Sequence, residues 1–382
     1  MNRLACLLLL AACGDNKATY TDAHGHGSDT GTSSDGHVPV PRAVAVAGDF
    51  GSPGVGTIAK LEIDQMMMSQ NLVPGAVLGD PVLRTLGSEL FVINRYGSNS
   101  ITILDRTTLA LADQISTGAN SNPQDVAVVG NKLYVPAMGT VGVVVITRGS
   151  PTQTTIDLSS LDTQGANDGK PDCVSAFAVG TKVYVACGLL DSFTATENGK
   201  VAIIDSATDT LVGSVTLNYK NPYGFFIQAP ADSTYVGDLL IATAPSFSDY
   251  ATGCIERVST GATPTAACGL TNAELAGFVN KLAIDDGKLY AAIGTYDSSF
   301  QNPTGKVRAF DLQAGTLAPS PISSASELIV DVAACPGGQV VGMDQTLNAA
   351  GLRVWKDGTE RTTEPISIGM PPTTNALVCY DP

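Results

Sequence analysis

The hydrophobic positions of this chain fall into short apolar runs that recur along the sequence. Aligning the runs on one phrase gives seven copies: AVAVAG at Ala43, LFVINR at Leu90, LYVPAM at Leu133, VYVACG at Val183, LLIATA at Leu239, LYAAIG at Leu289 and QVVGMD at Gln339. Nearly continuous runs of Val, Ile, Leu and Tyr predict β-strands that are buried on both faces. Units of roughly 40 to 50 residues with several such strands are typical of β-propeller blades.

Each repeat also has a strand before the phrase and a hairpin after it. NPQDVAVVG from Asn122 and VNKLAIDDG from Val279 are examples of the preceding strand. IIDSATDTLVGSV from Ile203 shows the hairpin, whose Asp, Thr and Gly residues favour a tight turn. The sequence therefore predicts an all-β, seven-bladed β-propeller with four antiparallel strands in each blade.

The two ends of the repeat array predict how the ring closes. The first unit, from Ala43, lacks a strand before its phrase, whereas the chain finishes with a spare one, NALVCYD from Asn375. An open ring would leave unpaired strand edges, which closure removes. We therefore expect the C-terminal strand to be the innermost strand of the first blade, and residues 43–382 to form one domain.

The first residues have the pattern of an export signal. Arg3 is followed by an apolar run from Leu4 to Ala12 and then by Cys13, and the run is too short for a permanent membrane span. Leu10 to Cys13 resembles the bacterial lipobox, which implies cleavage after residues 1–12 and diacylation of Cys13. An ordinary secretory signal with two incidental cysteines is the alternative.

This N-terminal pattern predicts that the protein is located in the cell envelope, with the lipid on Cys13 as its membrane anchor. Gly14 rather than Asp follows the cysteine, which in the familiar sorting pattern implies the outer membrane. Residues 13–42 have almost nothing apolar to bury and are expected to be a flexible tether. They contain all three histidines, His24, His26 and His37. A solvated linker is a simpler interpretation of these than a weak metal site.

The repeat resembles a known group of proteins. LYVP and VYVA, followed by KVAIIDSATDTLVGSV, are similar to the YVTN-type propeller repeat of bacterial surface and periplasmic proteins. The resemblance covers residues 43–382 and implies the propeller fold. It transfers no catalytic residue. Residues 156–172 and 220–226 also resemble segments of cell-surface propeller lipoproteins.

The charge balance narrows the choice of partners. The chain has 36 Asp and Glu against 21 Lys and Arg, a net charge of −15. A surface of that sign repels phosphate backbones and anionic lipid headgroups. We therefore expect no nucleic-acid partner, and a membrane contact through the lipid anchor alone.

Six cysteines lie in the predicted propeller, and an even number in an exported protein favours disulfides. The propeller arrangement selects three bonds: Cys173–Cys187 around Gly180, Cys254–Cys268 around Gly261, and Cys335–Cys379 between the innermost strands of blades seven and one. A two-residue turn in either hairpin would require a β-bulge to bring the partners opposite each other. Free buried thiols are the alternative for each pair.

Motifs for catalysis are missing from the propeller sequence. It has no histidine, which removes Ser-His-Asp and Cys-His catalysis and the commonest metal ligand. It has no CxxCH sequence and no Walker or dinucleotide glycine motif in a suitable context. Its single Trp, Trp355, rules out tryptophan-docking repeats. The sequence therefore predicts a non-catalytic binding or scaffolding module that requires no cofactor.

Two loop regions are candidate sites. In LDTQGANDGKPD, oxygen ligands on a bending chain suit Ca²⁺, although the spacing matches no EF-hand and a polar connection between blades is the simpler interpretation. Its candidate ligands are Asp162, Asn167, Asp168 and Asp172. The second region combines aromatics and acids in the long connections between strands two and three of blades four to six. Its residues are Asp191, Phe193, Phe247, Asp249, Tyr250, Tyr296, Asp297 and Phe300.

Aromatic faces beside acids suit a sugar, a peptide or a protein surface, unless the rings pack against their own loops. The competing hypothesis is a Ca²⁺-dependent lactonase or related hydrolase, in which acids and amides near the channel bind the metal and activate water. Its candidate ligands are Asp125, Asn280, Asp285 and Asp331. They are scattered singly, and the fold hosts many activities, so the binding module is the preferred interpretation.

Overall fold

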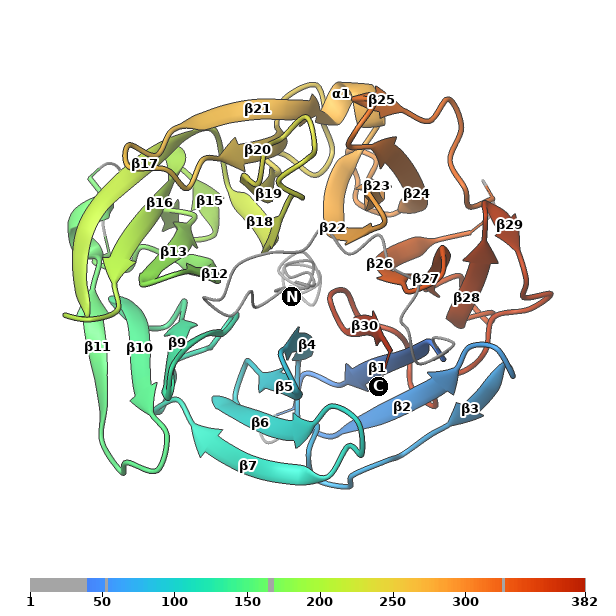
Figure 1. The fold of residues 1–382 in the computed structure, drawn as a ribbon, viewed down its shortest axis with the longest axis horizontal. Coiled ribbons are helices and arrows are strands. Elements are labelled where there is room, and N and C mark those ends of the chain that lie inside the picture. The colour runs from blue at the N-terminus through green and yellow to red at the C-terminus, as the bar shows by residue number, and fades with distance from the viewer. Residues whose placement is uncertain (1–39, 52–53, 164–167, 325–326, 382) are drawn as a thin grey trace.

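The protein is described by a computed structural model that covers residues 40–51, 54–163, 168–324 and 327–381. In that part of the chain, seven four-stranded antiparallel sheets are arranged in a ring (Figure 1). The predicted fold class and the predicted number of blades are confirmed. The predicted signal peptide, Cys13 and the tether up to residue 39 lie outside the described residues. None of the described helices is long and apolar enough to cross a membrane.

Within each blade the strands follow one another outward from the ring axis. The innermost strands, from blade one to blade seven, are β30 (Leu377–Tyr380), β4 (Pro81–Leu86), β8 (Ala127–Val129), β12 (Cys173–Val179), β18 (Pro222–Gln228), β22 (Phe278–Asp285) and β26 (Ile329–Cys335). The second strands are β1 (Arg42–Gly48), β5 (Glu89–Asn94), β9 (Lys132–Pro136), β13 (Lys182–Cys187), β19 (Leu239–Thr243), β23 (Lys288–Thr295) and β27 (Gln339–Asp344).

The outer two strands complete each sheet. The third strands are β2 (Gly56–Glu62), β6 (Ser100–Asp105), β10 (Gly142–Thr147), β16 (Asn198–Asp205), β20 (Cys254–Val258), β24 (Thr304–Asp311) and β28 (Gly351–Lys356). The outermost are β3 (Met67–Ser69), β7 (Leu111–Ser116), β11 (Gln153–Asp157), β17 (Thr210–Lys220), β21 (Ala266–Thr271), β25 (Thr316–Leu317) and β29 (Thr359–Glu360). The second strands are the recurring phrases of the sequence, and each begins within two residues of its phrase.

Neighbouring blades pack face to face, and this explains the continuous hydrophobic runs. Phe91 and Ile93 of β5 share one buried cluster with Leu133 and Val135 of β9 in the next blade. Both faces of a second strand are covered in this way, because alternate residues point to opposite faces of a strand. The core is therefore a series of interfaces between blades.

The ring closes as predicted. β30 pairs with β1, and Ala43 lies opposite Cys379 in the register of the two strands. The Cys335–Cys379 disulfide joins β26 of blade seven to β30 of blade one, with 5.1 Å between the Cα atoms. β30, the last strand of the chain, thus completes blade one, whose other three strands are the first strands of the chain, β1, β2 and β3.

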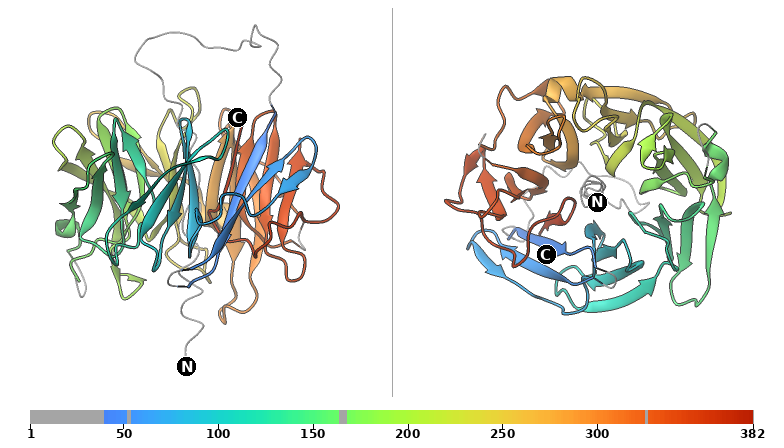
Figure 2. Two further views of the ribbon diagram at one scale, coloured as in Figure 1. Left: turned by 90° about the horizontal axis from the view of Figure 1, so that it is seen from below. Right: turned by 180° about the vertical axis from the view of Figure 1, so that it is seen from behind.

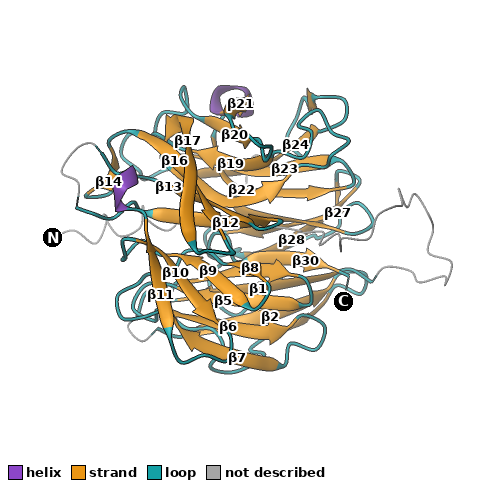
Figure 3. Cartoon of the chain, turned by 60° about the vertical axis from the view of Figure 1, so that its left-hand side comes forward, coloured by secondary structure: helices purple, strands orange, loops and turns teal. Residues whose placement is uncertain are grey.

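Connections alternate between the two ends of the ring because the strands are antiparallel. The connections between second and third strands gather at one end, which we call the 2–3 end: residues 49–55, 95–99, 137–141, 188–197, 244–253, 296–303 and 345–350. The 188–197 connection contains a short hairpin formed by β14 (Leu190–Asp191) and β15 (Thr194–Ala195). Val40 and Asp381 meet at the opposite end, where the Val40 amide donates to Asp381 Oδ1 at 3.1 Å. The left view of Figure 2 shows the ring from the side, and Figure 3 shows β14 and the C-terminus at opposite ends.

Among the described residues, two short helices lie outside the blades. The 3₁₀ helix Ser159–Leu161 follows β11, and α1 (Asn272–Leu275) follows β21. α1 begins with a capping box, in which Thr271 and Glu274 satisfy each other's backbone amides.

The blade-four disulfide is confirmed with the predicted irregularity. Gly180 adopts a positive φ of 58° in a two-residue turn between β12 and β13. A β-bulge between Cys173 and Ser175 then places Cys173 directly opposite Cys187, and the two form a disulfide.

The third predicted disulfide, Cys254–Cys268, is wrong in this structure, because both residues are free thiols. The hairpin between β20 and β21 turns through residues 259–265, so Cys254 lies opposite Thr271 and Cys268 lies opposite Glu256. Cys254 is buried and Cys268 is exposed. A displacement of two residues in register leaves the sulfurs as diagonal rather than direct neighbours.

Buried ion pairs connect the innermost strands around the ring axis. Arg84 of blade two and Asp125 of blade three are fully buried, with 2.9 Å between Nη2 and Oδ2. Arg84 also donates to the carbonyls of Ala176 in blade four and Phe226 in blade five. Asp125 accepts from the amide of Ala176 and from the hydroxyl of Ser175. One ion pair thus links four blades.

A second ion pair links the other three. Lys281 of blade six and Asp331 of blade seven are fully buried, with 3.1 Å between Nζ and Oδ1. Lys281 donates to the Leu377 carbonyl, and the Ala376 amide donates to Asp331, both at the closing strand of blade one. Burial raises the pKa of Asp125 and of Asp331 to about 6, and the neighbouring cations oppose the rise.

Replacing Arg84 with Met leaves the Asp125 carboxylate buried without its cation. We expect the free energy of unfolding to fall by about 3–5 kcal/mol in urea unfolding at neutral pH. The loss should shrink in acid, because a protonated Asp125 has no charge to desolvate. Lys182→Met, which breaks the partly exposed pair with Asp205, is the control and should cost less than about 1 kcal/mol. Equal losses in the two variants would contradict this role.

The cysteine assignment is tested by alkylating the unfolded protein without reductant and mapping its peptides. We expect label on Cys254 and Cys268 and none on the four disulfide-bonded cysteines. In the folded protein Cys268 should react first, because Cys254 is buried. Recovery of a disulfide-linked peptide that contains both Cys254 and Cys268 would show that the third predicted disulfide does form.

Candidate functional site

Five aromatic side chains form one cluster between blades five and six, here called the aromatic cluster: Tyr223, Phe247, Phe278, Tyr296 and Phe300. Phe247 contacts Tyr223 and Phe278 edge to face, with centroid distances of 5.3 and 5.0 Å. Phe278 stacks on Tyr296 at 5.8 Å, and Tyr296 lies 6.0 Å from Phe300. The predicted residues Phe247, Tyr296 and Phe300 are therefore together, and Tyr223 and Phe278 were not predicted.

The cluster is positioned by the ends of strands. Tyr223 and Phe278 lie at the beginning of the innermost strands β18 and β22 and are buried, whereas Phe300 in the 296–303 connection is 36% exposed. The Tyr296 amide donates to the Phe247 carbonyl at 3.2 Å and ties the two connections together. Phe278 lies opposite Gly294 of β23, where an added Cβ would come within 3.1 Å of the ring. The rings thus extend from the interior to the surface of the 2–3 end.

The acids predicted beside these rings organise their own loops. Asp297 accepts from the amides of Ser299 and Gln301 and from the side chains of Ser299 and Asn302. The hydrogen bonds from the Ser299 and Asn302 side chains lower the pKa of Asp297 to about 2. Asp249 accepts from the Ala251 amide at 2.9 Å, and Tyr250 beside it is 37% exposed. These carboxylates shape the connections that carry the rings.

Blade four does not contribute to the aromatic cluster. Asp191 pairs with Thr194 in the β14–β15 hairpin, and Phe193 at its tip is 69% exposed. None of the ring contacts among the described residues involves Phe193. The charge of Asp191 acts instead on Asp162, whose pKa it helps to raise.

The acidic loop between blades three and four brings three of its four predicted residues near one another, and Asn167 lies outside the described residues. Burial raises the pKa of Asp162, and the charges of Glu197 and Asp168 raise it further. Burial also raises the pKa of Asp172 to about 7, and its hydrogen bond from the Leu190 amide opposes the rise. Lys200 lies among these groups and donates to the Leu161 carbonyl and to Glu197.

The residues considered for a metal in the channel do not gather at one point. Asp125 and Asp331 are each held by a buried cation, as described above. Asp285 ends β22, the strand on which Asn280 lies near the beginning. Within residues 40–381, gaps excepted, no group of three or more His, Cys, Asp or Glu side chains has a metal-binding arrangement.

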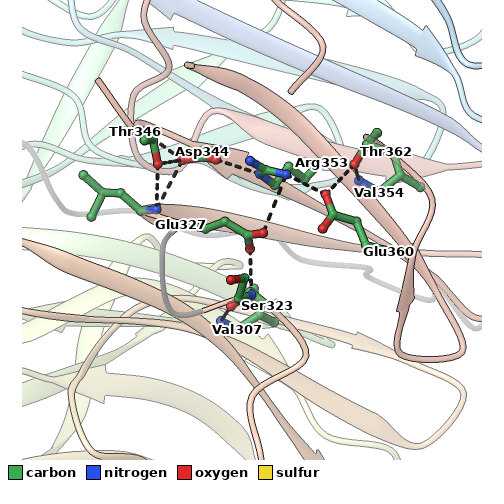
Figure 4. A network of polar contacts seen from close by, with 11 residues as sticks. Val307, Ser323, Glu327, Asp344, Thr346, Arg353, Val354, Glu360 and Thr362 are labelled. Carbon is green, nitrogen blue, oxygen red and sulfur yellow. Dashed lines mark hydrogen bonds and ion pairs between the residues drawn. The ribbon is translucent and has the colours of Figure 1, made fainter. Parts of the chain in front are cut away.

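Blade seven contains a polar network that the sequence interpretation missed (Figure 4). Arg353 contacts Asp344 and Glu360 at 2.7 Å each and Glu327 at 3.6 Å. Asp344 also accepts from the Thr346 amide at 2.8 Å, at the base of the 345–350 connection. Three carboxylates around one guanidinium are satisfied by these contacts, so the network fixes the connection rather than offering a free acid.

No protein-family model matches the chain, and none of the curated proteins matches it. Among solved structures, the crystal structure of Citrobacter koseri AztD is similar with a TM-score of 0.50 and 11% identity, over 90% of this chain and 98% of that one. Hydrazine synthase of Kuenenia stuttgartiensis is similar with a TM-score of 0.48 and 16% identity, over 70% of this chain and 73% of that one. The likeness to AztD supports the propeller fold alone.

The raised pKa of Asp172 predicts a pH dependence of stability. Between about pH 4 and 7 the folded state keeps a proton that the unfolded chain has released, so stability falls as the pH rises. Asp172→Asn keeps an acceptor for the Leu190 amide and should raise the melting temperature by a few degrees at about pH 8. Calorimetric scans across this range check it, with the exposed Asp232→Asn as the control. A decline with the wild-type slope in Asp172→Asn would contradict the assignment.

Proposed function

We propose that this protein is a non-catalytic binding module whose ligand docks on the 2–3 end over blades five and six. The observation that carries the proposal is the aromatic cluster, which runs from buried Tyr223 and Phe278 to exposed Phe300. Rings anchored in this way lose little conformational entropy on binding and present apolar area to a ligand. The rigid closed ring supports the same role.

The disulfides and the first residues favour an exported protein. Disulfides persist in oxidising compartments, and Cys173–Cys187 and Cys335–Cys379 are both buried. The lipobox-like Leu10 to Cys13 favours an envelope lipoprotein of the YVTN type, anchored at the outer membrane through Cys13. Mass spectrometry of the mature N-terminus tests this part of the proposal.

The binding role is tested by selecting ligands for the purified protein from a random peptide display library and from a glycan array. The selected ligand should bind Tyr296→Ala and Phe300→Ala roughly tenfold more weakly, because each variant removes ring area at the cluster. Leu111→Ala, on the exposed outermost strand β7, is the matched control and should bind normally. A selected ligand that binds both cluster variants as tightly as the wild type would contradict the proposal, and so would the failure to select any ligand.

Catalysis by a Ca²⁺-dependent lactonase or hydrolase is the alternative, and it requires calcium binding near the channel by the candidate ligands Asp125, Asn280, Asp285 and Asp331. The cations held by Asp125 and Asp331 favour binding over this alternative. Calcium calorimetry combined with a panel of lactones and esters separates the two. Tight calcium binding with turnover, both lost in Asp285→Asn, would support the enzyme.

A further inference from the structure

Large hydrophobic side chains that remain exposed are unevenly placed on the described residues. Eight of the thirteen lie in the connections of the 2–3 end, and every blade contributes at least one. Blades one to three contribute Phe50 with Val55, Tyr96 and Val141. Blades four to seven contribute Phe193, Tyr250, Phe300 and Leu347. We call these eight the apolar ring.

The rest of the surface provides the contrast. Val236 is the exposed large hydrophobic of the connections at the opposite end, and Val40 lies at the start of the described chain. The other three, Met67, Leu111 and Val212, lie on outermost strands. Single exposed hydrophobics are ordinary, but one or more from each of seven blades around one end is a concentrated apolar surface.

The charged side chains of the seven connections between second and third strands are acidic apart from one buried arginine. These connections contain one basic residue, Arg95, which is buried and paired with Asp80 at 2.6 Å. They contain five acids: Asp49, Asp191, Glu197, Asp249 and Asp297. Glu197 pairs with Lys200, and no ion pair among the described residues involves the other four. Carboxylates without an ion pair therefore lie beside the exposed apolar side chains in blades one, four, five and six.

We propose that the 2–3 end is a docking surface for a protein partner whose contact surface combines Lys or Arg with aliphatic side chains. This inference rests on the proposed function and extends it from blades five and six to the whole ring. Charge complementarity selects such a partner, because a cationic surface is attracted to the carboxylates while its aliphatic groups cover the apolar ring. The same carboxylates repel an anionic bilayer and a second copy of this face.

The test uses labelled synthetic peptides of equal length in anisotropy titrations against the purified protein. One peptide combines Lys and Arg with Leu, a second replaces the basic residues with Ser, and a third replaces them with Glu. We expect the cationic peptide to bind at least roughly tenfold more tightly than the acidic one, and to weaken with added salt. Asp191→Asn combined with Asp249→Asn should reduce that salt dependence.

The extent of the surface is tested with residues outside the aromatic cluster. The triple variant Tyr96→Ser, Phe193→Ser and Leu347→Ser should weaken the cationic peptide roughly tenfold. The matched triple variant Met67→Ser, Leu111→Ser and Val212→Ser removes as many exposed hydrophobics elsewhere and should bind normally. Circular dichroism checks that both variants are folded.

Four results would overturn the inference. They are equal or tighter binding of the neutral or acidic peptide, equal behaviour of the two triple variants, flotation of the soluble Cys13→Ser protein with phosphatidylglycerol vesicles, and self-association lost in the 2–3 end variant. If display selection yields a ligand that depends on Tyr296 and Phe300 while the cationic peptide fails, the proposed function stands and this inference is wrong. If selection yields no ligand, the proposed function itself fails.

Discussion

The pairing of β30 with β1 is the interaction on which the rest of the structure depends. It supplies blade one with its innermost strand, and the Cys335–Cys379 bond holds that strand against blade seven. The axial polar contacts also require it, because Asp331 accepts from the Ala376 amide and Lys281 donates to the Leu377 carbonyl. Without the closing strand, a buried carboxylate and a buried ammonium would each lose a partner, which is costly in a low-dielectric interior.

The buried ion pairs near the ring axis limit which residues are available to bind a ligand. Two of the three acids considered for a metal near the channel, Asp125 and Asp331, are paired here with Arg84 and Lys281, and each accepts a hydrogen bond from a backbone amide of the following blade. Their charges stabilise contacts between blades and are not available to a ligand. The connections of the 2–3 end also contact neighbouring blades, as in the bonds of Arg95 to Gln124 and of Tyr296 to Phe247, but they carry exposed side chains and are the parts that can specify a partner.

Periodicity predicted the fold because each blade repeats one strand pattern, and the missing first strand predicted the closure. The register of paired strands was harder to predict from the sequence. The Gly180 turn and its bulge place Cys173 opposite Cys187, whereas the 259–265 connection shifts the next hairpin by two residues and leaves Cys254 diagonal to Cys268, with the two thiols in contact but not bonded. Tyr223 and Phe278 were missed because they lie on innermost strands, whereas the sequence analysis searched the connections between second and third strands. The two buried ion pairs near the axis have a sequence pattern that could have predicted them, because Asp-Val-Ala occurs at the innermost strand of both blade three and blade seven.

The two ends of the ring differ in a way that bears on the partner. The described chain begins and ends at the end opposite the 2–3 connections, where Val40 contacts Asp381. Under the proposed anchoring through Cys13, the membrane attachment therefore enters the propeller at the end opposite the 2–3 connections. The 2–3 end is acidic as well as apolar, so anionic headgroups repel it while its exposed side chains, such as Leu347 at 86% exposure, favour burial. Attachment and charge therefore favour the same result, a surface that is directed toward proteins rather than toward lipid.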